Sequence, residues 1–261
     1  MSRIPKILHY CSFGGSFDVD SSIIESWKKY CPDYEIICWN ESNFDINCCT
    51  YVKQAYENKK WAFVSDVARL TALENYGGIY LDTDVELVKN LDKFLNHGVF
   101  FGFENDTRVG TAIIGSTPNN PIIFDLLCDY FHREFTSSQG DNDLTTNVQR
   151  VSEYLKKHGF PLNGSYVDRV NVALYPKDYF YPKDFVTGKL NMTSHTCAIH
   201  HYNASWKTQE EDMRDKLFFR LKSKLPEKFS WNLASYFSAV RHRGIFTAHR
   251  DMIKLLAGKK G

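Results

Sequence analysis

The sequence has no long hydrophobic run and no excess of charge, and each absence excludes a class of protein. No stretch of about 18 consecutive apolar residues occurs, so a membrane-spanning helix is not expected. The formal net charge of +1 lacks the basic balance of a general nucleic-acid binder. The first residues also lack the apolar segment of a signal peptide, so we expect a cytoplasmic protein.

Cysteine motifs are also missing. The seven cysteines are odd in number and none stands in a C-x-x-C pair, which argues against a disulfide framework or a zinc ribbon. We therefore expect reduced, mostly buried thiols. At 261 residues the chain is long enough for one large core with an appendage. Aromatic residues make up 15% of it, which fits a rich core or a groove that stacks sugars and bases.

The order of predicted elements is typical of an α/β protein with a nucleotide-binding layer. Apolar runs predict strands at residues 6–11 and 34–39, and helical spacing predicts a helix over residues 21–30 that begins at a Ser21-Ser22 cap. A polar, turn-rich segment over residues 136–147 predicts a loop that could act as a lid or contact the acceptor. The other predicted elements are a helix from Trp61 to the Gly77-Gly78 pair, strands at 79–85, 99–103 and 111–115, and a helix over 121–135.

The strongest functional signal follows the Gly77-Gly78 pair. Because side chains alternate along a strand, Tyr80, Asp82 and Asp84 are expected to share one face of the strand predicted at residues 79–85. Two carboxylates then lie together at the carboxyl end of a strand, where open α/β sheets bind ligands. They repel each other unless a cation lies beside them, and hard oxygen ligands suit Mg²⁺ or Mn²⁺. The alternative is a solvated acidic strand end, but the position after an apolar strand favours a site.

These residues resemble a known family. The region from Ser65 to Asp84 resembles the sugar-binding D-x-D region of glycosyltransferase family 32, which shares the motif with yeast initiating α-mannosyltransferases and large glucosylating toxins. The start of the chain and a segment near residue 200 are similar to the family's terminal segments. The matching residues are Ser65-Asp66-Val67-Ala68-Arg69, Leu73, Gly77-Gly78-Ile79-Tyr80-Leu81-Asp82-Thr83-Asp84, Ile4 to Cys11 with Phe13-Gly14-Gly15, His200-His201-Tyr202 and Ser205-Trp206.

The resemblance implies a GT-A fold, with a mixed sheet flanked by helices, that works with Mn²⁺ or Mg²⁺ and retains anomeric configuration. It implies that Asp66 and Arg69 hold hydroxyls of the donor sugar and that Asp84 binds the metal. The expected catalytic residues are Asp66, Arg69, Asp82 and Asp84. The expected donor-binding residues are His9, Tyr10, Phe13, Gly14, Trp39, Tyr80, Ser205 and Trp206, and the expected metal ligands are Asp82, Asp84 and His201.

One departure from the family concerns the donor base. Family members commonly have Trp before the Phe-Gly-Gly turn, where it stacks on the base, and this chain has Ser12. Tyr10, Phe13 or Trp39 could substitute. For Asp66 and Arg69, the alternative to a sugar site is a simple surface ion pair between residues three apart on a helix.

The chemistry can follow either of two routes. A double displacement needs a carboxylate nucleophile, for which Glu104 and Asp106 are candidates, although loop acids are common. We favour front-face substitution, in which a leaving phosphate oxygen accepts the acceptor's proton. The expected function is hexose or N-acetylhexosamine transfer from a nucleoside-diphosphate sugar, a UDP-sugar by preference, to a saccharide or lipid-linked saccharide of surface polysaccharide synthesis.

The C-terminal residues differ in charge from the rest. Residues 213–261 contain 12 Lys and Arg against 3 Asp and Glu, a local charge of +9, with an apolar stripe that includes Leu217 and Leu221. We expect a GT-A domain over residues 1–212 and a basic amphipathic helical tail over residues 213–261. The tail either lies on the anionic inner face of the plasma membrane or packs on the domain with a solvated basic face.

The sequence also allows two rival functions. The strand that contains Asp82 also fits the opening strand of haloacid-dehalogenase-type phosphatases, with Asp82 as nucleophile, although that strand normally begins the fold. The second rival is a carbohydrate-binding protein without catalysis.

Overall fold

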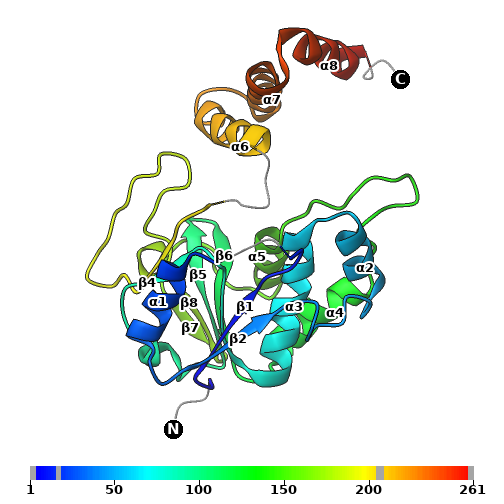
Figure 1. The fold of residues 1–261 in the computed structure, drawn as a ribbon. Coiled ribbons are helices and arrows are strands. Elements are labelled where there is room, and N and C mark those ends of the chain that lie inside the picture. Colours follow the sequence, from blue (N-terminus) through cyan, green and yellow to red (C-terminus); the bar gives the residue numbers. More distant parts are fainter. Residues whose placement is uncertain (1–3, 16–18, 204–208, 258–261) are drawn as a thin grey trace. The chain divides into compact units, whose positions relative to one another are not determined.

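The computed structural model describes residues 4–15, 19–203 and 209–257, and the chain divides into two compact units. The first unit contains the residues up to Lys183 together with Leu190–His201, and the second contains Asp184–Lys189 and the residues from Tyr202 onward. Figure 1 shows the order of the elements along the chain.

A seven-stranded mixed sheet forms the centre of the first unit, in the order β2-β1-β3-β6-β5-β8-β7. β1 runs parallel to β2 and β3, β5 runs parallel to β8, and β6 lies antiparallel between β3 and β5. The α/β class with a mixed sheet flanked by helices is therefore confirmed. The strands of this sheet are β1 (Ile7–Cys11), β2 (Glu35–Trp39), β3 (Gly78–Leu81), β5 (Val99–Asn105), β6 (Arg108–Ser116), β7 (Val167–Arg169) and β8 (Val172–Tyr175).

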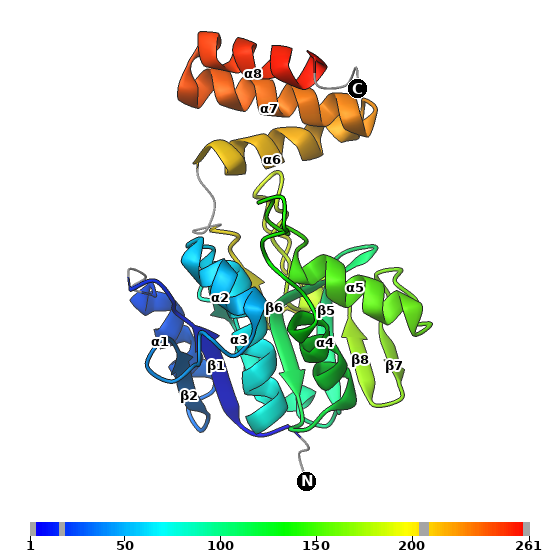
Figure 2. The same cartoon turned by 90° about the vertical axis from the view of Figure 1, so that its right-hand side faces the viewer.

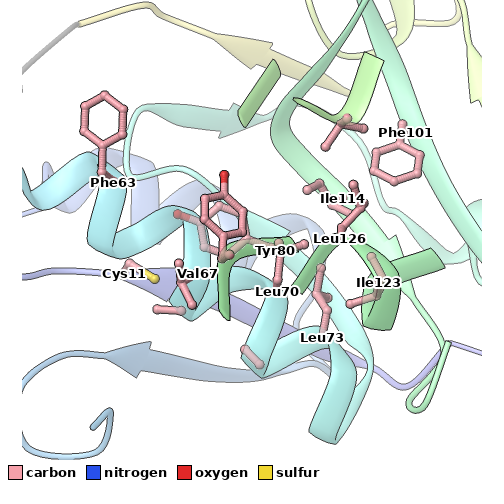
Figure 3. Close-up of a cluster of buried hydrophobic side chains, with 14 of the residues drawn as sticks. Cys11, Phe63, Val67, Leu70, Leu73, Tyr80, Phe101, Ile114, Ile123 and Leu126 are labelled. Atoms are coloured by element: carbon pink, nitrogen blue, oxygen red, sulfur yellow. The ribbon is translucent and has the colours of Figure 1, made fainter. Parts of the chain in front are cut away.

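Helices cover the sheet. Figure 2 shows α3, α4 and α5 in front of it, while α1 packs against β4, where the Trp27 indole donates a hydrogen bond to the Val85 carbonyl at 2.7 Å. The main hydrophobic core contains residues of β1, β3, β5 and β6 together with α2, α3, α4 and α5 (Figure 3). The helices of this unit are α1 (Ser21–Tyr30), α2 (Thr50–Glu57), α3 (Trp61–Tyr76), α4 (Pro121–Phe131) and α5 (Asn147–Lys157), with 3₁₀ turns at Asp92–Phe94 and Lys177–Tyr179.

The structure corrects the strand predicted at residues 79–85. β3 ends at Leu81, a turn closed by a hydrogen bond from Val85 N to Asp82 O follows, and β4 (Val85–Leu87) then pairs with β9 (Ala198–His200) in a separate ribbon. Aspartate favours turns because its side chain can bond nearby backbone, so the D-x-D sequence breaks the strand. The two aspartates therefore lie on a tight turn between two sheets.

Two smaller predictions also change. The cap of α1 is Asp20, whose Oδ1 accepts from Ser22 N at 3.0 Å, rather than the Ser21-Ser22 pair. α4 ends at Phe131, four residues before the predicted end. The predicted glycine terminator of α3 is confirmed, since Gly77 and Gly78 have φ of 63° and 100°. A side chain at Gly78 would also come within 2.7 Å of the Ile7 carbonyl oxygen, so the close approach of β1 requires glycine there.

The second unit contains helices α6 (Gln209–Lys222), α7 (Glu227–Arg243) and α8 (Ile245–Ala257). α7 packs on both neighbours, and its buried positions are the small residues Ser230, Ala234, Ser238 and Ala239. α6 begins at Gln209, so the predicted division after residue 212 falls inside this helix. Its first turn contains Glu210, Glu211 and Asp212, acids that interact favourably with a helix N-terminus. Among the described residues, no helix has both the length and the apolar character needed to cross a membrane.

Candidate active site

A buried ion pair on α3 forms one side of the site. Arg69 Nη2 lies 3.0 Å from Asp66 Oδ1, and the two residues are only 5% and 8% exposed. This burial excludes the surface ion pair that was the alternative for these residues. The helix buries them because its face toward the sheet also carries Val67, Leu70 and Leu73.

Arg69 connects α3 to the D-x-D turn. Its guanidinium lies 3.3 Å from Asp82 Oδ1, donates to the Thr111 carbonyl at 2.8 Å and covers the Tyr80 ring at 4.4 Å from the ring centre. The Tyr80 hydroxyl donates to the same Asp82 oxygen at 2.9 Å. Two donors on one carboxylate oxygen fix the orientation of Asp82. In this structure Tyr80 is a support for Asp82 and is itself buried.

Three potential metal ligands come together at the turn. Ligand atoms of Asp82, Asp84 and His200 all lie within 4.8 Å of one another, and His200 Nε2 is 3.3 Å from Asp84 Oδ1. The β4–β9 pairing brings His200 there, because it places His200 opposite Val85, the residue after Asp84. Two carboxylates and an imidazole form a donor set that suits a divalent ion such as Mn²⁺, so the residues fit the expected metal.

His201, the histidine predicted as a metal ligand, lies elsewhere. Its Nε2 is 2.9 Å from Glu86 Oε2, and its backbone carbonyl accepts a hydrogen bond from Lys183 at 2.8 Å. Neighbouring side chains on a strand point to opposite faces, so only one of two adjacent histidines can face the aspartates. The geometry therefore replaces His201 by His200 in the candidate ligand set.

The charges of the cluster act on its titratable groups. Burial alone would lower the pKa of His200, but the hydrogen bond to Asp84 and the charges of Asp84, Asp82 and Glu104 outweigh it and raise that pKa above its usual value. Burial raises the pKa of Asp66 to about 6, against the opposing charge of Arg69. An excess of negative charge around the imidazole is what a bound cation would neutralise.

The predicted donor-binding residues of the first strand are mostly engaged with the protein. His9 is fully buried, with Nε2 2.7 Å from the Gly77 carbonyl, and its Nδ1 accepts from the Trp39 indole at 3.1 Å. Phe13 is buried against Phe44. A contact of these side chains with the donor stays a prediction.

The glycine turn after β1 is held in place on both sides. Gly14 N–H donates to Glu41 Oε1 at 2.7 Å, and a side chain at Gly14 would come within 2.5 Å of the Trp61 indole. Tyr10 is half-buried with its ring edge on Trp27. Ser205 and Trp206, predicted to bind the donor, lie outside the described residues.

Polar residues that the sequence did not single out lie close to Asp66. Tyr51 of α2 and Asn147 and Arg150 of α5 are buried there. Asn147 is the last residue of the loop predicted over 136–147 and the first residue of α5, which Thr146 caps by accepting from Gln149 N. The signal that could have found Arg150 is its position on a helix whose apolar face includes Val151 and Leu155.

Comparison with known proteins identifies the class of the protein. A family model described as a glycosyltransferase sugar-binding region containing the DXD motif matches residues 18–101. An uncharacterized glycosyltransferase of Acanthamoeba polyphaga mimivirus is 32% identical over 220 residues, which cover 78% of this chain and 84% of the relative. A mannosyl phosphorylinositol ceramide synthase of Saccharomyces cerevisiae is 30% identical over 144 residues, which cover 49% of this chain but only 36% of the yeast protein.

Among solved structures, the PaToxG glycosyltransferase has a TM-score of 0.45 at 20% identity, and the match covers 60% of this chain and 70% of the PaToxG chain. The galactosyltransferase LgtC, in complex with donor and acceptor sugar analogues, has a TM-score of 0.44 at 12% identity and covers 85% of this chain and 98% of its own. The sequence matches show that the chain belongs to the glycosyltransferases with a DXD-containing sugar-binding region, as its resemblance to glycosyltransferase family 32 predicts.

Proposed function

We propose that this glycosyltransferase is a GT-A type, metal-dependent enzyme that transfers a hexose or N-acetylhexosamine, with retention of configuration, from a nucleoside-diphosphate sugar. The donor is a UDP-sugar and the acceptor a saccharide or lipid-linked saccharide in surface polysaccharide synthesis. The observation that carries the proposal is the cluster of Asp82, Asp84 and His200 beside the buried Asp66–Arg69 pair. It sets a cation site next to a polar group that can bind hydroxyls.

Each side chain has a distinct task in this scheme. A divalent ion held by Asp82, Asp84 and His200 would supply positive charge for the leaving diphosphate. Arg69 and Tyr80 hold the Asp82 carboxylate in one orientation through 3.3 Å and 2.9 Å contacts. Asp66 accepts hydrogen bonds from hydroxyls of the sugar, and its burial strengthens such hydrogen bonds. The enzyme thus mainly positions two substrates and stabilises the departing group.

We favour front-face substitution over a covalent intermediate. Asp106 is exposed, which is typical of a loop acid, whereas Glu104 is half-buried and contributes negative charge at His200. In front-face substitution the bond to the leaving phosphate oxygen breaks as the acceptor oxygen bonds to the anomeric carbon on the same face, and that phosphate oxygen takes the acceptor's proton.

The phosphatase alternative gains no support. Asp82, its required nucleophile, is held by Arg69 and Tyr80 and follows β3, which is not the first strand of the chain. The matches to glycosyltransferases point the same way.

A thermal-shift panel tests the proposed function. UDP-sugars and GDP-mannose are added with and without Mn²⁺, and we expect at least one sugar nucleotide to raise the melting temperature only when Mn²⁺ is present. Asp84→Asn should abolish this shift, whereas Asp45→Asn, an exposed acid before α2, should leave it unchanged. Slow Mn²⁺-dependent hydrolysis of the same donor would separate an enzyme from a carbohydrate-binding protein. Equal shifts in Asp84→Asn and the native protein would contradict the metal-centred scheme.

We also propose that the protein is cytoplasmic and that its C-terminal helices contact the anionic inner face of the plasma membrane. Supporting this, apolar side chains on α7 and α8 are exposed, with Phe246 at 90%, beside the basic run Arg241-His242-Arg243. We expect Phe246→Ser to weaken sedimentation with phosphatidylglycerol vesicles, whereas Phe131→Ser on α4, 49% exposed, should not. Equal sedimentation of both variants and the native protein would remove the idea.

A further inference from the structure

Polar side chains from three helices meet around Asp66 inside the first unit. Tyr51 of α2 is fully buried, Asn147 and Arg150 of α5 are 3% and 8% exposed, and Asp66 of α3 is 8% exposed. The Tyr51 and Tyr130 rings lie 4.9 Å apart, the Arg150 guanidinium lies over the Tyr130 ring at 5.3 Å, and the Tyr130 hydroxyl is 3.4 Å from Asn147 Oδ1. Tyr130 therefore joins the group.

Three atoms of this group make no hydrogen bond of regular geometry, although Tyr51 lies close to Arg150, and Asn147 lies close to Asp66. They are Tyr51 Oη, Asn147 Nδ2 and Arg150 Nε, all buried. A buried polar atom without a partner costs free energy, and native proteins contain few of them. Their gathering around one carboxylate is a feature that a ligand or ordered water would satisfy.

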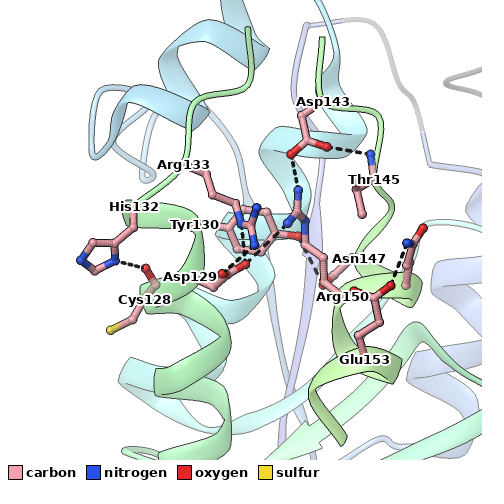
Figure 4. A network of polar contacts seen from close by, with 11 residues as sticks. Cys128, Asp129, Tyr130, His132, Arg133, Asp143, Thr145, Asn147, Arg150 and Glu153 are labelled. Atoms are coloured by element: carbon pink, nitrogen blue, oxygen red, sulfur yellow. Dashed lines mark hydrogen bonds and ion pairs between the residues drawn. The ribbon is translucent and has the colours of Figure 1, made fainter. Parts of the chain in front are cut away.

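The charge of Arg150 is already balanced. Its Nη2 bonds Asp143 Oδ2, and its Nη1 lies 3.5 Å from Asp129 Oδ2 (Figure 4). Asp129 also binds Arg133 at 2.7 Å. The group therefore has no spare positive charge to attract an anion. What it offers is buried N–H and O–H groups together with the Asp66 carboxylate.

A neutral hydroxyl fits such a set, because it can accept from an N–H and donate to a carboxylate at the same time. We propose that Tyr51 and Arg150, together with Asn147 and Asp66, form a buried pocket for hydroxyls of the donor sugar, and that Tyr51 and Arg150 determine which neutral hexose the enzyme accepts. This inference rests on the proposed glycosyltransferase reaction. It implies that a sugar that lacks a hydroxyl at this end is rejected, because the buried donors would stay without partners.

Entry into the pocket involves the segment between α4 and α5. Asp143 in this segment bonds Arg150 and is itself tied back by a hydrogen bond from Asp143 N to the Phe135 carbonyl. Because the three atoms are buried, a sugar reaches them only when the chain around them moves, and we expect this segment to move because it bonds Arg150. The loop predicted over 136–147 is thus attached to α5 through Asp143.

The test is calorimetric titration of the full chain, with Mn²⁺ present, with UDP and with UDP-glucose, UDP-galactose and GDP-mannose. Tyr51→Phe removes only the hydroxyl. We expect it to weaken the binding of the preferred sugar nucleotide about tenfold and to leave the affinity for UDP unchanged. The difference in affinity between the hexose donors should become smaller. Tyr154→Phe is the matched control, since its hydroxyl bonds Asp125 near the surface, and it should bind like the native protein.

The outcomes distinguish a failure of the proposed function from a failure of the proposed pocket. If the native protein binds no nucleotide or sugar nucleotide with Mn²⁺, the proposed function fails. If the native protein binds them, the pocket is overturned when Tyr51→Phe weakens the binding of UDP and of the sugar nucleotide equally. It is also overturned when Tyr51→Phe weakens the binding of neither. A melting temperature several degrees lower in Tyr51→Phe, with unchanged sugar affinity, would show that the hydroxyl bonds ordered water and has a structural role only. Arg150→Lys, which keeps the charge but loses Nε, should shift the hexose preference without affecting UDP.

Discussion

Replacing Arg69 by Met removes the cation that joins the two carboxylates of the site. The guanidinium is 5% exposed and contacts Asp66 at 3.0 Å and Asp82 at 3.3 Å, besides the Thr111 carbonyl at 2.8 Å. Met has a similar length but no charge, so Asp66 would remain buried without its partner. Breaking a buried ion pair from one side costs about 3–5 kcal/mol.

For a protein of this size, 1 kcal/mol corresponds to a change of about 2–4 °C in melting temperature, so Arg69→Met should melt about 10 °C lower. Arg133→Met is the control, because its pair with Asp129 has side chains that are 42% and 43% exposed and should be worth less than about 1 kcal/mol. Chemical denaturation of both variants measures the two free energies of unfolding. A loss below about 1 kcal/mol in Arg69→Met would contradict a buried ion pair that joins Asp66 to Asp82.

Two further predictions concern pH. Burial lowers the pKa of His9 from 6.5 to about 4. Because the folded state favours the neutral ring, this residue contributes about 3 kcal/mol to the free energy of unfolding above pH 6.5, and the contribution is lost as pH falls toward 4. His9→Gln should remove that slope in denaturation curves, and an unchanged slope would contradict it. Burial raises the pKa of Asp66 from 3.8 to about 6, so its contribution is full below pH 3.8 and is lost as pH rises through 6. Asp66→Asn should leave stability rising more steeply between pH 4 and 6, and an unaltered profile would show that Asp66 titrates normally.

Five strands of the sheet and α3 could be predicted because their local signals agree with their tertiary setting, whereas β7 and β8 were not predicted. The apolar run of β1 and the glycine stop of α3 specify their elements without distant partners. α2 and α5 were not predicted, since their short amphipathic patterns are overlaid by polar residues that serve the Asp66 group, such as Asn147 and Arg150.

The acids of the site could be predicted from the sequence, but the histidine that faces them could not. The D-x-D motif indicated which acids meet, but the choice between His200 and His201 depends on how β9 pairs with β4, which is a contact between residues more than a hundred positions apart. His9 and Trp39 show the converse. Their residue types suit a donor site, but their mutual hydrogen bond in the core is visible only once β1 and β2 are paired.

The most direct test of the account compares the two neighbouring histidines. Calorimetric titration of Mn²⁺ in the presence of UDP is carried out on the native protein, His200→Ala and His201→Ala. We predict that His200→Ala loses Mn²⁺ affinity by at least tenfold, while His201→Ala, whose ring contacts Glu86 instead, binds like the native protein. Loss of Mn²⁺ binding in His201→Ala with full binding in His200→Ala would contradict the metal site described for Asp82 and Asp84.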